Sequence, residues 1–385
     1  GGQGVSAYAT RSRFVVSNYG MGGSLQSGMA ESRWGGPAAA LLKWETTNQF
    51  DIGLDIAFLN NRVNLTVDAY YKKTKDLLLD KLIPMSSGFS RIQANYGNVT
   101  NKGLEISGHF IPVKARNFLW SIDANISFNR NKVGGLDADQ YSDVAWGIEN
   151  MFLVRNGEPI GTLYGYVEDG FYDNEAEVRA DPLYRNETDS KVKSMVGEVK
   201  YKNLDDDPVI DNRDRQIIGN TNPDYQYGIT NTLEWKNWTF SFFLQGTQGN
   251  DVLNVNLKKF DMASVDNMPY FIYNNRWTAE NRANAKWPRA NRTSTRSMTA
   301  SDRYIEDGSY LRCKNVSLSY RFRHPMKFVE SINLVASVSN LFTISGYSWM
   351  DPDVNSFGSD PKRRGVDMAS YPSARTFNFG VQIGF

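Results

Sequence analysis

The sequence has few of the residues that build metal centres and nucleophilic active sites. Its 385 residues include one cysteine, Cys313, and two histidines, His109 and His324. An intrachain disulfide framework and a CxxC metal site are therefore excluded, and the two histidines argue against a histidine metal cluster. No run of about 18 apolar residues occurs, so no transmembrane helix is expected. The 43 basic and 42 acidic residues nearly cancel, which argues against nucleic acid as a partner.

Aromatic side chains, by contrast, are abundant, and many follow a period of two. The clearest case is the last segment, Arg375–Phe385, in which apolar residues alternate strictly with polar or small ones. A strand with one apolar face that ends on an aromatic residue is typical of a transmembrane β-barrel. A strand of a soluble β-sandwich is the alternative. The barrel interpretation predicts that five side chains face lipid: Phe377, Phe379, Val381, Ile383 and Phe385.

The same alternation recurs through the chain. It predicts about eleven strands of roughly ten residues, the length that crosses a bilayer at a tilt. Weaker signals near 148–156 and 161–171 are included in that number. The clearer segments are 50–58, 63–71, 104–106, 120–128, 225–229, 238–244, 316–322, 332–338 and 375–385.

Short and long connections alternate between these segments. The short turns are expected at 60–61, 112–117, 156–159, 235–237 and 323–331, and the long polar stretches near 74–100, 132–147, 172–223, 249–308 and 343–374. Outer-membrane barrels have short periplasmic turns and long extracellular loops, whereas a soluble sandwich has no reason to sort its loops. We therefore predict an all-β fold, a transmembrane antiparallel β-barrel.

The direction of the strands sets the expected domain organisation. If the C-terminus is periplasmic, residues 1–48 form an extracellular loop region and residues 49–385 form the C-terminal part of the barrel. About eleven strands is an odd number, whereas single-chain bacterial barrels have even counts. An open sheet edge in lipid would leave backbone groups unsatisfied. We therefore expect this chain to supply only part of a barrel wall.

Several motifs in order resemble the C-terminal half of SusC/RagA-family TonB-dependent outer-membrane transporters of Bacteroidota. They are spread over nearly the whole chain: Leu42–Gln49, Gly53–Arg62, Tyr70–Leu78, Asn95–Glu105, Asn275–Thr278, Trp287–Ala290, Ile305–Arg312 and Asn340–Thr343. The resemblance implies that the chain forms about half of a 22-stranded plugged barrel in the outer membrane of a Gram-negative bacterium. The N-terminal extension, TonB box and plug of that family have no match in this sequence.

The resemblance also implies a function and partners. It predicts TonB-dependent import of an oligosaccharide or a peptide, with a SusD-like surface lipoprotein that contacts the loops at 172–223 and 249–308. The TonB complex would act through an N-terminal region that this chain lacks. A passive porin and an outer-membrane barrel enzyme are the alternatives. An enzyme would need a nucleophile beside a histidine on one wall, and of the two histidines only His109 falls within a strand. We therefore expect no enzymatic activity.

One acidic loop has the spacing of an EF-hand-like calcium site. Positions one, three, five, seven, nine and twelve are Asn203, Asp205, Asp207, Val209, Asp211 and Asp214, with the Val209 carbonyl as the seventh ligand. Family members resemble this loop but carry glycine at position six, where this chain has Pro208. Proline fixes φ near −65°, roughly, and disfavours the turn. The alternative to calcium binding is a solvated acidic loop.

Aromatic residues in or near the long connections are candidates for substrate binding. Rings at such places stack on the apolar faces of sugars or pack on peptides. The alternative for each of them is packing within the loops or at the membrane interface. The candidates are Trp146, Tyr164, Trp277, Trp287, Tyr347 and Trp349.

Overall fold

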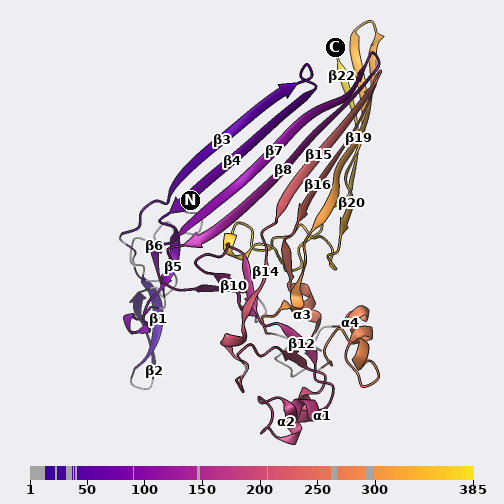
Figure 1. The fold of residues 1–385 in the computed structure, drawn as a ribbon. Helices are drawn as coiled ribbons and strands as arrows, with labels where there is room; N and C mark the ends of the chain where they lie inside the picture. Colours follow the sequence, from indigo (N-terminus) through magenta and orange to yellow (C-terminus); the bar gives the residue numbers. More distant parts are fainter. Residues whose placement is uncertain are drawn as a thin grey trace.

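The computed structural model describes residues 14–21, 24–31, 37, 39, 41–89, 91–144, 148–205, 207–261, 267–290 and 299–385. Its main feature is an antiparallel sheet of nine described strands, each paired with the next one along the wall (Figure 1). In spatial order they are β3 (Thr46–Phe58), β4 (Val63–Lys75), β7 (Asn98–Ala115), β8 (Phe118–Gly134), β15 (Tyr225–Trp235), β16 (Trp238–Gln248), β19 (Tyr310–Met326), β20 (Val329–Ser345) and β22 (Thr376–Gly384).

Strand register turns the sequence alternation into two chemically different faces. Leu54 pairs with Val67, which pairs with Ile106, so apolar side chains form rows across the strands on one face. The next row, on the opposite face, is polar and consists of Asp55, Thr66, Ser107 and Asn125. A one-residue slip would exchange the two faces, so this alternation fixes the register.

The connections are sorted by length to the two ends of the sheet (Figure 1). Residues 59–62, 116–117, 236–237 and 327–328 form short turns at one end, near the C-terminus. Leu59, Asn60 and Asn61 adopt left-handed backbone angles in the first of them, a conformation that asparagine tolerates. The other end carries what we call the loop region: the described residues within 76–97, 135–224, 249–309 and 346–375.

The prediction of two wall strands was wrong. The segments near 148–156 and 161–171 contain β10 (Ile148–Val154) and β11 (Thr162–Gly165), which pair in a small sheet and not in the wall. Five of the seven residues of β10, and all four of β11, are buried, so the two strands lack the alternating exposure of a wall strand. The turn at 156–159 therefore lies within the loop region, and the stretches 132–147 and 172–223 belong to one connection.

The loop region is folded and contains most of the small elements. β9 (Gln140–Val144) and β14 (Gln216–Asn220) complete the sheet of β10 and β11, and β17 (Asp251–Asn254) pairs with β18 (Ile305–Asp307) and β21 (Val366–Asp367). The others are β5 (Leu78–Leu82), β6 (Arg91–Asn95), β12 (Glu168–Phe171), β13 (Val199–Tyr201), α1 (Glu175–Ala180), α2 (Asp189–Met195), α3 (Val255–Asp261) and α4 (Tyr270–Asn275).

The predicted extracellular loop at 1–48 also contains regular structure. β1 (Phe14–Met21) and β2 (Ser24–Glu31) form a hairpin on the loop-region side, and β3 begins at Thr46. Residues 1–13 lie outside the described part of the chain.

The largest hydrophobic core among the described residues lies in the loop region, not within the large sheet. Ile148, Phe152, Leu163, Leu253 and Tyr304 are completely buried there, and we call the group around them the loop core. The apolar face of the wall is much more exposed, since Phe50 retains 67% of its accessible surface. Within the described ranges, no helix is long and apolar enough to cross a membrane. The two regions therefore bury apolar surface in different ways.

Candidate functional site

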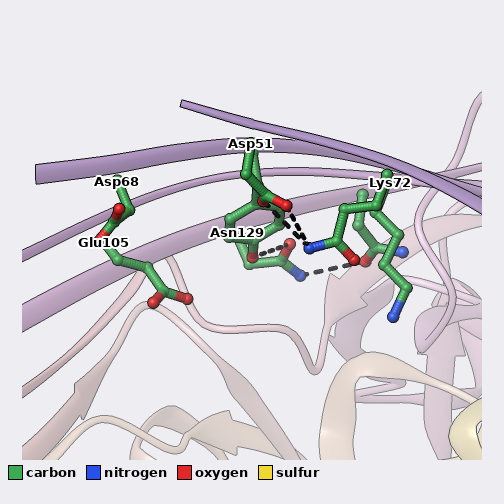
Figure 2. A pocket seen from close by; sticks show the side chains of 8 residues that line it. Asp51, Asp68, Lys72, Glu105 and Asn129 are labelled. Atoms are coloured by element: carbon green, nitrogen blue, oxygen red, sulfur yellow. Dashed lines mark hydrogen bonds between the residues drawn. The ribbon is translucent and has the colours of Figure 1, made fainter. Parts of the chain in front are cut away.

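The polar face of the large sheet holds an open pocket of about 520 Å³ near its N-terminal edge. Its walls come from β3, β4, β7 and β8, and Figure 2 shows their side chains projecting from the same face. The lining residues are Gln49, Asp51, Asp68, Tyr70, Lys72, Asn101, Glu105 and Asn129. Alternate positions of neighbouring strands thus converge on one polar hollow.

Two glycines make room for the side chains of this pocket. A Cβ at Gly103 would lie 2.1 Å from the Tyr70 ring, so the ring lies directly against the backbone of β7. From there the Tyr70 hydroxyl donates to Asn129 Oδ1 at 3.0 Å, which links β4 to β8 across β7. A Cβ at Gly53 would likewise lie 2.4 Å from Asp68 Oδ1. A larger residue at either glycine would displace a pocket side chain.

The pocket has more carboxylates than cations. Asp51 accepts two bonds from Gln49 Nε2, at 2.9 and 3.1 Å. Asp68 and Glu105 are directly opposite each other, and neither carboxylate has a hydrogen-bond or ion-pair partner among the described residues. Like charges in opposite positions are destabilising, and Lys72 is the one cation in the lining. The pocket is therefore suited to groups that donate hydrogen bonds, such as hydroxyls, amides and ammonium groups.

Catalytic chemistry has little support on this face. His109 Nδ1 lies 2.7 Å from Asp123 Oδ1, which gives a histidine–carboxylate pair on the polar side of β7 and β8. In the described part of the chain no serine or cysteine is hydrogen-bonded to His109, so the pair lacks the nucleophile of a triad.

The predicted substrate-binding aromatics do not gather into one exposed site. Trp146 lies outside the described residues. Trp277 and Tyr347 each retain 7% exposure and Tyr164 is also buried, so their rings offer little surface to a ligand. Trp277 donates to Asp173 Oδ1 at 3.1 Å, and Tyr347 donates to Asp367 Oδ2 at 2.7 Å. The half-buried Trp287 and Trp349 pack against the loop core. Substrate binding by these rings stays a prediction that their burial does not support.

Burial has an electrostatic consequence at Tyr347. The pKa of its hydroxyl is raised far above the usual range, first by burial and then by the Asp367 carboxylate. The phenol therefore stays protonated and donates to Asp367, which joins the start of 346–375 to β21.

Exposed rings occur instead on α4, which the sequence reading did not single out. Tyr270, Phe271 and Tyr273 retain 77%, 44% and 52% of their accessible surface, while Ile272 turns inward and is completely buried. Arg276 stacks on the Tyr273 ring at 3.7 Å. The aromatic residues at 270–273 were visible in the sequence. Which of them are exposed depends on the orientation of the short helix, which the sequence does not show.

The predicted calcium loop connects β13 to β14. Asp205, Asp207 and Asp211 all contact the guanidinium of Arg213, and Asp214 accepts bonds from backbone amides. Within the described ranges no cluster of acidic, histidine or cysteine side chains is arranged to hold a metal ion. As arranged here, the residues do not fit calcium, and calcium binding stays a prediction.

The last strand continues the apolar face of the wall. Phe377, Phe379, Val381 and Ile383 of β22 lie opposite Val338, Ala336, Leu334 and Ile332 of β20, while Asn378 and Gln382 lie opposite Ser337 and Asn333. The predicted lipid-facing set, which also includes Phe385, is exposed. Both faces of this edge strand are exposed, so contact of these residues with lipid stays a prediction.

Comparison with known proteins decides the family. Residues 7–341 match the family model of TonB dependent receptor-like β-barrels. The chain belongs to this TonB-dependent receptor β-barrel family. It is 33% identical to TonB-dependent receptor P26 of Formosa agariphila over 100% of the chain, and 29% identical to TonB-dependent receptor SusC of Bacteroides thetaiotaomicron over 89% of it. The predicted resemblance to SusC-like receptors of Bacteroidota is therefore confirmed.

The solved structure of the RagAB peptide transporter shows the same fold. The TM-score is 0.75 at 19% identity, over 100% of this chain and 39% of that one. This TonB-dependent receptor chain also spans 39% of the length of P26 and 32% of that of SusC. The prediction that the chain is part of a larger barrel is confirmed.

Proposed function

We propose that this chain is the C-terminal part of the barrel of a TonB-dependent importer in the outer membrane of a Gram-negative bacterium of the Bacteroidota. The family match over 7–341 is the observation that carries the proposal. The two-faced sheet supports it, because an apolar outer face suits lipid and a polar inner face suits an aqueous lumen. Coupling to the TonB complex would be made by parts of the protein outside this chain.

The cargo we propose is a neutral or cationic oligosaccharide or peptide. The RagAB peptide transporter, whose solved structure has the same fold, supports the peptide part of this range. The pocket on the luminal face supports it chemically, since Asp68 and Glu105 would accept hydrogen bonds from sugar hydroxyls or peptide ammonium groups. Anionic cargo would be repelled at this place.

A strain that lacks the complete transporter gene tests this proposal. It would be complemented with the full-length protein, and growth would be measured on a panel of single oligosaccharides and peptides. We expect one class to depend on the transporter. The double variant Asp68→Asn with Glu105→Gln should slow that growth. Ser317→Ala, in β19 on the same face of the sheet but outside the pocket, should not. Growth on every nutrient without the gene would contradict the proposal.

The partner we propose is a SusD-like surface lipoprotein bound to the loop region. Exposed aromatic residues are frequent anchors of protein interfaces, and α4 presents three of them at the edge of the loop region, away from the wall (Figure 1). We expect joint replacement of Tyr270, Phe271 and Tyr273 by alanine to reduce co-purification of the lipoprotein. Phe328→Ala changes an even more exposed ring, at the opposite end of the sheet, and is the control. Undiminished co-purification of the triple variant would exclude α4 as the anchor.

A further inference from the structure

The acidic side chains of the loop at 203–214 converge on a cation that belongs to the chain itself, Arg213. Arg213 follows Asn212 in a short 3-10 helix, Asn212–Asp214, and its side chain turns back over the loop. Its Nη1 lies 3.2 Å from Asp205 Oδ2, its Nη2 lies 3.0 Å from Asp211 Oδ2, and Nη2 also pairs with Asp207 Oδ2. These three carboxylates stand at positions three, five and nine of the calcium-loop spacing. One guanidinium thus contacts three of the four acidic side chains that a calcium ion would need.

The fourth acidic position is also occupied. Asp214, at position twelve, is 1% exposed, and each of its carboxylate oxygens accepts a backbone amide. Oδ1 accepts from Leu204 and Oδ2 accepts from Asp211, both at 2.8 Å. In a calcium loop of this type the twelfth residue gives both oxygens to the metal. Here both oxygens instead stabilise the turn that holds the loop together.

The middle of the loop follows the same arrangement. The Val209 amide donates to Asp207 Oδ1 at 2.8 Å, and the Val209 side chain is 44% exposed. Pro208 precedes it at the position where calcium loops place glycine, because the sharp turn there requires a backbone angle that proline cannot adopt. Asp207 therefore accepts a backbone amide of the loop through Oδ1, while its Oδ2 pairs with Arg213.

We propose that Arg213 replaces calcium in this loop, as a permanent internal counter-ion that lets the segment fold without a divalent metal. A guanidinium presents a fork of N–H donors that can pair with several carboxylates, and unlike a metal it does not dissociate. The inference is independent of the transported cargo. It implies that the connection between β13 and β14 keeps its structure in calcium-poor surroundings and in the presence of chelators.

The charges on both partners agree with this arrangement. Hydrogen bonds from the Arg213 side chain and backbone hold the pKa of Asp211 below its usual range, and the carboxylates raise the pKa of Arg213. The Arg213 side chain itself remains 60% exposed, so water screens each individual ion pair. Stabilisation of the loop therefore depends on the convergence of three carboxylates on one cation, and not on any single ion pair.

Hydrogen exchange measured by mass spectrometry on the full-length protein tests the proposal, because it reports on residues 203–214 separately from any metal site elsewhere. In the wild type we expect the same exchange rates in this segment with EDTA and with added calcium. In Arg213→Met we expect exchange on the order of tenfold faster in EDTA, since three carboxylates then repel one another without a cation. Arg185→Met removes an exposed arginine between α1 and α2 whose side chain has no partner among the described residues, and it should leave the segment unchanged.

Two results would overturn the proposal. One is slower exchange of residues 203–214 in the wild type when calcium replaces EDTA, together with loss of that effect in Asp207→Asn. The other is unchanged exchange in Arg213→Met in EDTA, which would show that the guanidinium does not hold the loop. If Arg213→Met unfolds the protein, the wild-type comparison still decides between the two cations.

Discussion

At the scale of single residues, the buried charges in the loop region and at the adjoining end of the wall differ in whether they have partners. Arg312 is 1% exposed and pairs with Asp351, while its Nε donates to Thr343 Oγ1 at 3.0 Å and its Nη1 to Ser373 Oγ at 3.2 Å. Lys258, in α3, is 3% exposed, and its Nζ has no hydrogen-bond partner in the described structure. The first charge holds a connection in place, whereas the second opposes the burial of its own helix.

Removal of Arg312 should loosen the connection at 346–375. Burial alone would raise the pKa of Asp351, but the amides of Ser373 and Asp353 and the Arg312 guanidinium lower it below its usual range. Asp351 therefore stays charged, and Arg312→Met leaves it buried without a counter-ion, at a cost of roughly 3–5 kcal/mol. We expect faster hydrogen exchange in 346–375 and little change in 203–214. Equal protection of 346–375 in both proteins would show that the ion pair does not anchor this connection.

Lys258 should make the stability of the loop region depend on pH. Burial lowers its pKa from 10.5 to about 8, so the folded state binds the proton more weakly than the unfolded state. The penalty is complete below about pH 8 and disappears as the pH rises toward 10.5. Its upper limit, the free-energy equivalent of the shift, is roughly 3 kcal/mol.

The variant Lys258→Met removes this penalty and serves as the test. At pH 7 we expect the loop region of the variant to unfold at a higher temperature than that of the wild type in differential scanning calorimetry. The gap should narrow as the pH rises from 8 to about 10. Lys191→Met, at an exposed position of α2, is the control. A difference in unfolding temperature that does not change with pH would mean that the buried Lys258 amine does not cause it.

At the scale of elements, strict alternation was sufficient to predict the wall and the sorting of its connections. It was not sufficient for β10 and β11, because strands buried on both faces carry no period-two signal. The pocket could have been found from the sequence, since Asp51, Asp68 and Glu105 occupy the alternate positions of predicted strands. The packing of Trp277 could not, because it depends on Gly197, where a Cβ would lie 2.5 Å from the indole.

The two faces of β22 should respond differently to charge. Val381→Arg places a guanidinium on the predicted lipid face near the middle of the strand, where insertion costs about 2–4 kcal/mol. Asn378→Arg adds the same charge to the opposite, polar face of the strand. We expect less folded protein in the membrane for the first variant than for the second, as measured by heat-dependent mobility on gels. Equal levels, or the reverse order, would show that the assignment of the faces is wrong.

At the scale of the whole molecule, the wall and the loop region are built differently and offer different surfaces. The nine described strands of the wall supply an apolar face and a polar face, while the folded loop region supplies a hydrophobic core, anchored connections and exposed rings. A simple pore has little use for a loop region with its own core, whereas an importer with a surface partner needs such a platform. The account thus depends on import being energised and not passive.

Uptake of the labelled cargo with and without functional TonB tests that claim most directly. The comparison would use cells that express the full-length protein, with a TonB deletion as the single change. The account predicts that uptake falls to the level of the transporter deletion when TonB is absent, while the amount of barrel in the outer membrane stays the same. Uptake that continues at the wild-type rate without TonB would contradict it and would identify the protein as a passive pore.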